Sequence, residues 1–451
     1  MPSVFWFRRD LRLKDNPALL AAVAHGDVLP VFVFSEELGE DVDRPRIQFL
    51  VDSLKELDSS IEAGGGKLCI RYGDPVDALA GLCAQVGATK VFSTKSWSTF
   101  RSAEDAHVAD KLATDDVSLE LVDSPYAIEP GAIYNKSGTP FKVFTPFSRV
   151  WASQGWSEPD NSIPKINWLT AKRNAKLPDV SAYDSEMPPA GEDAAHAQLE
   201  EFMAAAASGY SDNRNLPGVE GTSRLSHYLK WGTLHPRQIL AKLPTGSGAE
   251  VYRSEIAWRE FYADVLHHRP ETATEAFSEK MSRISYDEGP EADEAFERWA
   301  TGQTGFPIVD AGMRQLVQTG WMHNRVRMIV ASFLTKDLHI WWGRGAEFFM
   351  HHLIDGDLAS NSHGWQWTAG TGTDASPYFR VFNPVTQGRK FDKEATYIRR
   401  WIPEIAHLSD KHIHEPWLDP VGAPAGYPAP IVDHAEERLE ALARYEEVRA
   451  T

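Results

Sequence analysis

The feature that most constrains the fold is the regular alternation of strand and helix signals in the first part of the chain. Short apolar runs typical of buried strands occur at residues 4–7, 28–34, 68–72, 91–92 and 117–122. Helix signals stand between them: Asp15-Asn16-Pro17, the helical spacing of residues 46–63, and Gly73-Asp74-Pro75. Strands that alternate with helices predict a doubly wound parallel sheet.

The glycines of this region do not form a known nucleotide-binding loop. No Gly-x-Gly-x-x-Gly follows the first apolar run, and Gly64-Gly65-Gly66 is followed by Lys67-Leu68 rather than by Lys-Ser or Lys-Thr. A dinucleotide or triphosphate site of those types is therefore not expected. A sheet of this kind usually binds its ligand at the carboxyl ends of its strands.

The character of the chain changes after this region. Residues 129–195 are rich in Pro, Gly, Ser and Asn, which predicts a long connector on the surface. From His196 onward helical periodicity dominates, as at residues 255–267 and 309–338, without a convincing strand. We predict an α/β, Rossmann-like domain at 1–130, a linker at 131–195, and a large all-α domain at 196–451.

The charge distribution indicates a local anion-binding surface. The net charge of −18 is unfavourable for nucleic acid as a whole, because lysines and arginines supply most non-specific affinity. Residues 314–400, however, contain eleven lysines and arginines against seven aspartates and glutamates. Arginines alternate there with Trp, Phe, His and Asn, a pattern that favours phosphate binding over a merely solvated face.

The sequence lacks membrane, secretion and metal signals. Residues 1–12 are interrupted by charges, and no apolar run approaches the ~20 residues that span a bilayer. Cys69 and Cys83 have no metal-ligand spacing with histidine, so we expect two reduced, buried thiols and no metal site. We expect a cytoplasmic monomer without an obligatory protein partner.

Four motifs crowd into one later region, at residues 321–328, 354–361, 364–367 and 383–388. Arginines, acidic turns, an amide and closely spaced tryptophans suit a planar, partly charged aromatic cofactor held against an aromatic ligand. Asp355-Gly356-Asp357 alone suits an ordinary solvated turn, since the other ligands of a calcium loop are missing. With Arg327 and Asn361 it predicts a polar pocket.

Two earlier motifs fit the same interpretation. Residues 221–226 precede an apolar helical stretch, so their hydroxyls suit either a helix cap or a phosphate site. Glu255, Trp258, Arg259 and Tyr262 share one helical face. Because charged groups are costly to bury without partners, we expect this face to meet a polar ligand.

Together these motifs resemble the cyclobutane pyrimidine dimer branch of the photolyase and cryptochrome family. The resemblance covers residues 210–433 and the amino-terminal stretch 5–12. It implies a helical domain that binds flavin adenine dinucleotide (FAD), active in its reduced anionic form, and light-driven repair of ultraviolet-damaged DNA by electron transfer. Asn361 matches the photolyases, and Asn324 and Met328 stand where a (6-4) photolyase has histidines. A cryptochrome-type blue-light photoreceptor is the alternative.

The resemblance also implies individual roles. The predicted FAD-binding residues are Tyr210, Thr222, Ser223, Arg224, Leu225, Ser226, Arg259, Asn324, Arg327, Asp355, Gly356, Asp357 and Asn361. The predicted catalytic residues, which face the dimer, are Glu255, Trp258, Asn324, Met328 and Trp367. The predicted DNA contacts are Arg214, Arg325 and Gln387, together with Glu255, Trp258, Asn324 and Trp367.

The resemblance further implies an electron-transfer chain. Trp365 and Trp342 match its first two carriers, and Tyr286 stands near the usual third tryptophan, with Trp299 as an alternative route. A second, antenna chromophore stays unassigned between deazaflavin and folate. The folate branch has an Asn-Glu pair where this chain has Phe100-Arg101, and of the deazaflavin signals only Arg46 matches.

Overall fold

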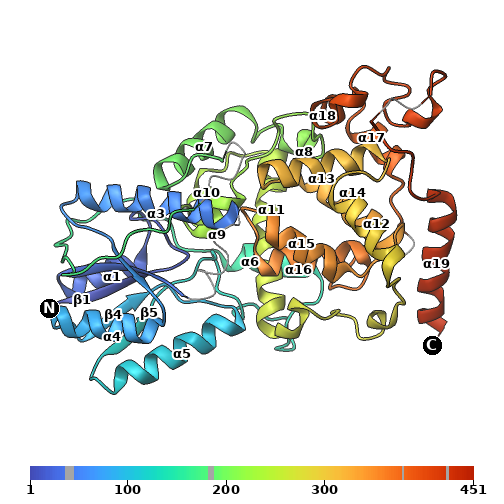
Figure 1. Cartoon of the computed structure of the whole chain (residues 1–451). Coiled ribbons are helices and arrows are strands. Elements are labelled where there is room, and N and C mark those ends of the chain that lie inside the picture. Colours follow the sequence, from blue (N-terminus) through green and yellow to red (C-terminus); the bar gives the residue numbers. More distant parts are fainter. Residues whose placement is uncertain (36–44, 181–186, 378–379, 423–425, 451) are drawn as a thin grey trace. The chain divides into compact units, whose positions relative to one another are not determined.

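The protein folds as two compact units. The computed structural model describes residues 1–35, 45–180, 187–377, 380–422 and 426–450, without the side chains of residues 99 and 100. The antenna indication at Phe100 thus lies outside the described side chains. The α/β unit comprises Met1–Phe141, Thr145–Ala207 and Ser223–Pro270, and the helical unit comprises Lys142–Phe144, Ser208–Thr222 and Glu271–Thr451 (Figure 1). The domain limits at residues 130 and 195 stay a prediction, because the units are defined by packing.

The α/β unit is built on a parallel five-stranded sheet with the strand order β3-β2-β1-β4-β5. Its strands are β1 (Ser3–Phe7), β2 (Val28–Phe34), β3 (Cys69–Tyr72), β4 (Lys90–Ser93) and β5 (Ser118–Leu121). The connecting helices are α1 (Pro17–His25), α3 (Pro45–Ala63), α4 (Pro75–Val86) and α5 (Thr99–Ala113). Figure 1 shows α3 on one side of the sheet and α4 and α5 on the other. The predicted doubly wound sheet is confirmed.

The predicted helix starts are also confirmed. The Asn16 side chain accepts a hydrogen bond from Leu19 N at 3.1 Å, and Pro17 begins α1. Asp74 accepts from Val76 N at 2.7 Å in the same way before α4. Every residue of β1 and β2 is buried, as expected of parallel strands covered on both faces.

The region predicted as a connector contains a helix. Helix α6 (Phe144–Gln154) lies inside it, and α7 (Glu192–Ala205) begins before its end. The buried Phe147 and Trp151, four residues apart, mark the face of α6 that packs, and Phe147 contacts Phe261. Turn-forming residues around this short aromatic stripe obscured it in the sequence.

The remaining helices carry most of the predicted site. In the α/β unit they are α9 (Ser226–Trp231), α10 (Pro236–Lys242) and α11 (Ser247–His268). In the helical unit they are α8 (Tyr210–Asn213), α12 (Pro290–Ala300), α13 (Pro307–Thr319), α14 (Asn324–Lys336), α15 (Trp342–His352), α16 (Leu358–Ala369), α17 (Pro384–Phe391), α18 (Thr396–Trp401) and α19 (His434–Ala450). Short 3-10 helices occur at Pro270–Ala273, Met281–Arg283, Pro403–Ile405 and Pro416–Leu418. Within the described residues, no strand follows His196, as predicted.

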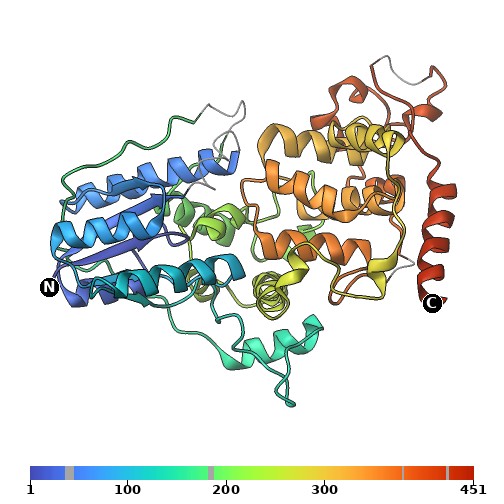
Figure 2. The same ribbon diagram turned by 60° about the horizontal axis from the view of Figure 1, so that its bottom comes forward.

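One predicted helical stretch, at residues 309–338, is two helices. Gly320 adopts a left-handed conformation with φ of 66° and ends α13. His323 begins α14, because its Nδ1 accepts a hydrogen bond from Arg325 N at 3.1 Å. The hydrophobic period runs through the break, since residues on both helices enter the same buried cluster of the helical unit. Figure 2 shows the helices of this unit, coloured yellow to orange, packed together.

Two findings concern membrane-spanning helices and the cysteines. None of the described helices combines the length and apolar content needed to cross a bilayer. Cys69 and Cys83 are free and buried, as predicted, and burial raises the pKa of the Cys83 thiol to about 12.

Candidate functional site

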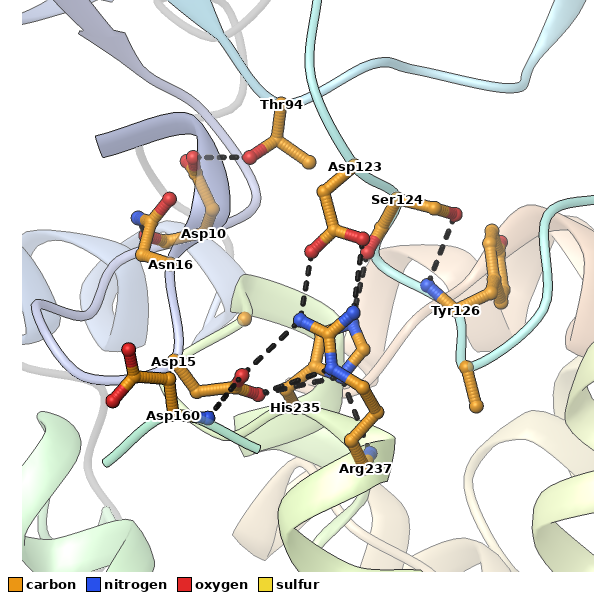
Figure 3. Close-up of polar contacts among 12 residues, drawn as sticks. Asp10, Asp15, Asn16, Thr94, Asp123, Ser124, Tyr126, Asp160, His235 and Arg237 are labelled. Carbon is orange, nitrogen blue, oxygen red and sulfur yellow. Dashed lines mark hydrogen bonds and ion pairs between the residues drawn. The ribbon is translucent and has the colours of Figure 1, made fainter. Parts of the chain in front are cut away.

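The carboxyl end of the sheet carries a buried network of charges (Figure 3). Arg237 of α10 donates to both carboxylate oxygens of Asp123, at 2.9 and 2.8 Å, and to Asp15 at 3.2 Å. His235 Nδ1 accepts from the backbone of Arg237, so Nε2 carries the proton that it donates to Ser124 O at 2.8 Å. Burial, followed by neighbouring arginines, lowers the pKa of His235 well below its usual value. The network fastens the segment after Ser223 to the sheet and leaves the ring of His235 neutral.

Helix α11 is anchored by a buried acidic side. The Glu260 carboxylate accepts from Trp151 Nε1 at 2.6 Å and from Ile128 N at 3.1 Å. Asp264, one turn later, accepts from Gly131 N at 2.7 Å. Burial raises the pKa of both carboxyls, that of Asp264 to about 6. These contacts fix the rotation of the helix about its axis.

The predicted ligand face of α11 lies on another side. Glu255, Trp258, Arg259 and Tyr262 are all half-buried, which agrees with a surface that another group can cover. Arg259 donates to the backbone carbonyls of Pro125 and Leu229, and Trp258 packs on Tyr262 with a centroid distance of 5.3 Å. The face is therefore held in place from within the α/β unit.

The hydroxyl-rich stretch before α9 forms a fixed loop. Tyr252 Oη donates to Ser223 Oγ at 2.7 Å, and Leu225 N donates to the same oxygen at 3.4 Å. Leu225 itself caps α9, without a side-chain hydrogen bond. Arg224 adopts φ of 52°, a conformation that a non-glycine residue keeps only when its surroundings impose it. Ser226 begins α9, and Thr222 belongs to the helical unit.

In the helical unit the predicted polar residues are held by ordered contacts, and two of them, Arg327 and Asp355, pair with each other. Arg327 of α14 donates to Asp355 Oδ2 at 2.9 Å, and its Nε donates to Met322 O at 2.8 Å. Asp357 begins α16 by accepting from Ser360 N at 3.1 Å. One turn later, Asn361 Nδ2 donates to Ala346 O of α15 at 2.8 Å. The amide is thereby oriented with its oxygen as an acceptor on the opposite side.

Helix α14 presents three predicted residues on one side. Asn324, Arg327 and Met328 follow the three-and-four spacing of neighbours on a helix surface. Asn324 is exposed and Met328 is half-buried. An amide and a thioether therefore stand one turn apart, beside the Arg327–Asp355 ion pair.

Two buried polar side chains fix helix α16. His363 Nδ1 donates to Ala359 O at 2.8 Å, and its Nε2 pairs with Thr272 Oγ1 at 2.9 Å. Gln366 accepts from Phe277 N and donates to Thr272 O, both at 2.8 Å. Burial lowers the pKa of His363 to about 4, so the ring stays neutral at physiological pH. These contacts set the directions of Trp365 and Trp367.

Two of the predicted electron carriers, Trp365 and Trp342, are buried in the core of the helical unit. Trp365 makes edge contacts with Phe349 and Trp299, at centroid distances of 5.0 and 6.1 Å. Its ring lies against Gly345, because a Cβ at that position would be 2.2 Å from Trp365 Cη2. Trp342 lies three residues before Gly345 on the same helix. Tyr286 is elsewhere in this unit, in an apolar cluster with Ile284, Tyr445 and Val448.

A basic corner forms near α14 and α17. Arg325 donates to Asn215 Oδ1 at 3.1 and 2.7 Å and lies 4.5 Å from the ring centroid of Phe391. Arg214 lies over the ring of Tyr210, and its charge, after burial, lowers the pKa of Arg325. The two arginines are therefore close. Gln387, half-buried, lies on α17, the helix that supplies Phe391.

The predicted site residues are divided between the units. The α/β unit holds Ser223, Arg224, Leu225, Ser226, Glu255, Trp258 and Arg259, and the helical unit holds the others. Sequence reasoning missed the residues that position them: His363, Gln366, Asn215 and Phe391. The one available signal was the glutamine between Trp365 and Trp367, because a polar residue inside an aromatic motif requires a buried partner.

The chain matches two families of known proteins. Residues 3–165 match DNA photolyase, and residues 252–447 match the FAD-binding domain of DNA photolyase. It is 39% identical to the deoxyribodipyrimidine photo-lyase of Agrobacterium fabrum over 100% of this chain and 98% of that protein, and 39% identical to that of Escherichia coli over 98% of each.

Solved structures agree with these matches. A bacterial class III photolyase from Agrobacterium tumefaciens superposes with a TM-score of 0.92 at 38% identity, covering 100% of this chain and 98% of the other. A cryptochrome from Synechocystis gives 0.87 at 26%, covering 99% of each chain. Fold and site thus define an FAD-binding flavoprotein with an amino-terminal α/β unit. The chain belongs to the DNA photolyase family.

The residues present in the helical unit fit the cofactor. Flavin combines ring carbonyls and N–H groups with a ribityl chain and a diphosphate, and it requires acceptors, donors and a positive charge. Asp357, the fixed amide of Asn361, and the Arg327–Asp355 pair supply these groups. Within the described part of the chain, no group of histidines, cysteines or carboxylates is arranged to hold a metal ion.

Proposed function

We propose that this protein is a light-driven deoxyribodipyrimidine photo-lyase that splits cyclobutane pyrimidine dimers in ultraviolet-damaged DNA. The observation that carries the proposal is near-complete coverage, at 39% identity, by proteins of that name. The ordered Arg327–Asp355 and Asn361 contacts support it, because they arrange flavin-binding groups within one unit.

FAD would be held by the predicted set. Asp355, Asp357 and Asn361 would face the ring, and Tyr210 and residues 222–226 would face the diphosphate. When bound and reduced, FAD supplies the electron that blue light excites. Because the Asn361 nitrogen is already bonded to Ala346 O, its oxygen is suited to accept an N–H of the reduced ring.

Other residues would receive the flipped-out dimer. Trp258 and Trp367 offer flat faces that replace lost base stacking. Glu255 and Asn324 would hydrogen-bond the pyrimidine carbonyls and stabilise the negative charge that develops there. Met328 would supply the apolar wall.

The basic corner would hold the DNA backbone. Arg325 is bonded to the neutral oxygen of Asn215, so its charge is not cancelled by that partner. Arg214 raises the local positive potential. A phosphate between them would relieve the repulsion of two like charges, and Gln387 would add a neutral contact.

Trp365 and Trp342 would refill the flavin with electrons when it is oxidised, and Tyr286 and Trp299 are the predicted candidates for the outer end of this relay. The relay would prepare the enzyme for repair and would take no part in the repair step.

Light-dependent repair tests the proposal directly. The FAD-loaded, reduced protein should restore thymine absorbance in irradiated oligo-thymidine under blue light and not in the dark. Glu255→Ala should bind damage nearly as well but repair it with a lower quantum yield, because its hydrogen bond matters most after charge arrives. Glu250→Ala, an exposed change on the same helix, is the matched control. No repair at full flavin occupancy would refute the assignment.

A cryptochrome-type photoreceptor is the second candidate, supported by the Synechocystis likeness. It would bind FAD and respond to light without splitting dimers. The same assay separates the two, since a photoreceptor would show flavin photochemistry and no thymine recovery.

We also propose that the protein is a cytoplasmic monomer with a second, antenna chromophore. Light scattering on the purified protein tests the monomer, and fractionation of its host tests the location. Absorption and mass spectrometry of the native protein would distinguish deazaflavin from folate.

A further inference from the structure

An exposed indole lies beside a buried one at the start of α15. Trp341 directly precedes the helix and is 42% exposed, whereas Trp342 is 2% exposed. Their ring centroids are 5.7 Å apart with an interplanar angle of 57°. The Trp341 ring folds back over Gly343, where a Cβ would lie 2.3 Å from its Cη2. The glycine therefore permits the exposed indole to stay against the helix start.

The buried indole connects inward. Trp365 is 3% exposed and lies against Gly345, three residues after Trp342 and on the same side of α15. Trp365 therefore contacts α15 one turn from Trp342, and Trp342 in turn lies against the exposed Trp341.

The other two candidates for the outer end are Trp299, which is fully buried, and Tyr286, which is half-buried. Trp299 is 0% exposed, and its Nε1 donates to Val330 O at 3.0 Å, so its N–H has no route to water. Tyr286 packs with Tyr445 and Val448 of α19. Burial raises the pKa of the Tyr286 hydroxyl, and an oxidised phenol must release its proton.

We propose that Trp341 is the terminal electron donor when light reduces the oxidised flavin, an inference that rests on the FAD-dependent function proposed above. One electron passes from Trp365 to the excited oxidised flavin, one from Trp342 to Trp365, and one from Trp341 to Trp342. The Trp341 radical cation releases its indole proton to water. A small external thiol then gives one electron and one proton to the neutral radical and becomes a thiyl radical, so that the thiol is the net source of the transferred electron.

The exposure of Trp341 favours it as the terminal electron donor. A cation at the surface is hydrated, whereas a cation on either buried indole is not. Loss of the N–H proton to water also prevents rapid return of the electron. The buried carriers therefore pass the charge outward and Trp341 retains it.

Transient absorption on the FAD-loaded protein tests the assignment. The parent should show a long-lived neutral tryptophanyl radical whose decay accelerates with added thiol. Trp341→Phe should lose that signal, while Tyr286→Phe should keep it. Trp417→Phe, a half-buried tryptophan packed on Phe306 in the same unit, is the matched control and should also keep it. A long-lived radical that persists in Trp341→Phe, or disappears in Tyr286→Phe, would overturn the proposal.

Two further measurements separate the explanations. Gly343→Ala keeps all three indoles but displaces the Trp341 ring, so the long-lived signal should shrink. A spin-trap adduct located by peptide mass spectrometry should lie on Trp341 after illumination, and an adduct only elsewhere contradicts the proposal. Flavin content and thermal unfolding verify that each variant is folded. If the flavin of Trp365→Phe is still reduced by light, the whole proposed relay is wrong. If only the Trp341 assignment is contradicted, the proposed repair function is unaffected.

Discussion

Gly345→Ala should be destabilising although alanine is the better helix former. The new Cβ would lie 2.2 Å from Trp365 Cη2 and 2.5 Å from its Cζ3, distances that real Cβ atoms do not adopt. The indole is confined by Phe349 and Trp299, so it cannot move away freely. Overpacking costs about 1–3 kcal/mol and the gain in helix propensity is about 1 kcal/mol. We expect a net loss of up to about 2 kcal/mol.

The double mutant isolates the cause. Phenylalanine lacks the second ring of the indole, so Gly345→Ala in a Trp365→Phe background should cost nothing or stabilise slightly. Urea unfolding of the four proteins, followed by circular dichroism, measures the coupling. An equal cost of Gly345→Ala in both backgrounds would show that the Trp365 ring is not seated on this glycine.

Three other outcomes are expected. The free energy of unfolding should fall as the pH drops from about 6.5 to about 4, because His363 binds a proton in the unfolded chain but not in the native protein, where its pKa is about 4. This difference in pKa corresponds to about 3 kcal/mol. The variant His363→Gln should lose this part of the pH dependence. Arg325→Ala should weaken binding to damaged DNA and reduce the salt slope by roughly one, whereas Asn215→Ala should leave the slope unchanged; this is checked by titration at several salt concentrations. Trp365→Phe should abolish light-driven reduction of oxidised flavin, as measured by flavin absorbance. The same variant should still repair DNA when its flavin is reduced chemically.

Local chemistry made most of the fold predictable. The apolar runs at 4–7 and 28–34 are strands because they are buried on both faces, and Asn16 and Asp74 begin helices through their own side chains. The break at Gly320 was not predicted, because the hydrophobic period continues across it. Helix α6 was not predicted either, because its stability comes from distant partners such as Glu260.

The difference between local signals and contacts with distant segments also applies to the candidate site. The sequence placed Arg327 and Asp355 in one polar pocket, and the two residues form an ion pair. It could not reveal that Arg325 rests on Asn215, or that Tyr286 packs with α19, since such contacts join segments far apart in sequence. Trp341 was overlooked because only its exposure distinguishes it from a core tryptophan.

The pairing of Arg237 with Asp15 and Asp123 has a consequence for synthesis on the ribosome. The sheet is complete in sequence by Leu121, but the arginine that neutralises the carboxylates at its edge emerges more than a hundred residues later. At ~5–20 residues per second, the nascent sheet must wait several seconds before Arg237 can pair with these carboxylates. A chain halted before α10 should therefore remain sensitive to protease, and release of arrested chains of increasing length should show protection only once Arg237 has left the exit tunnel.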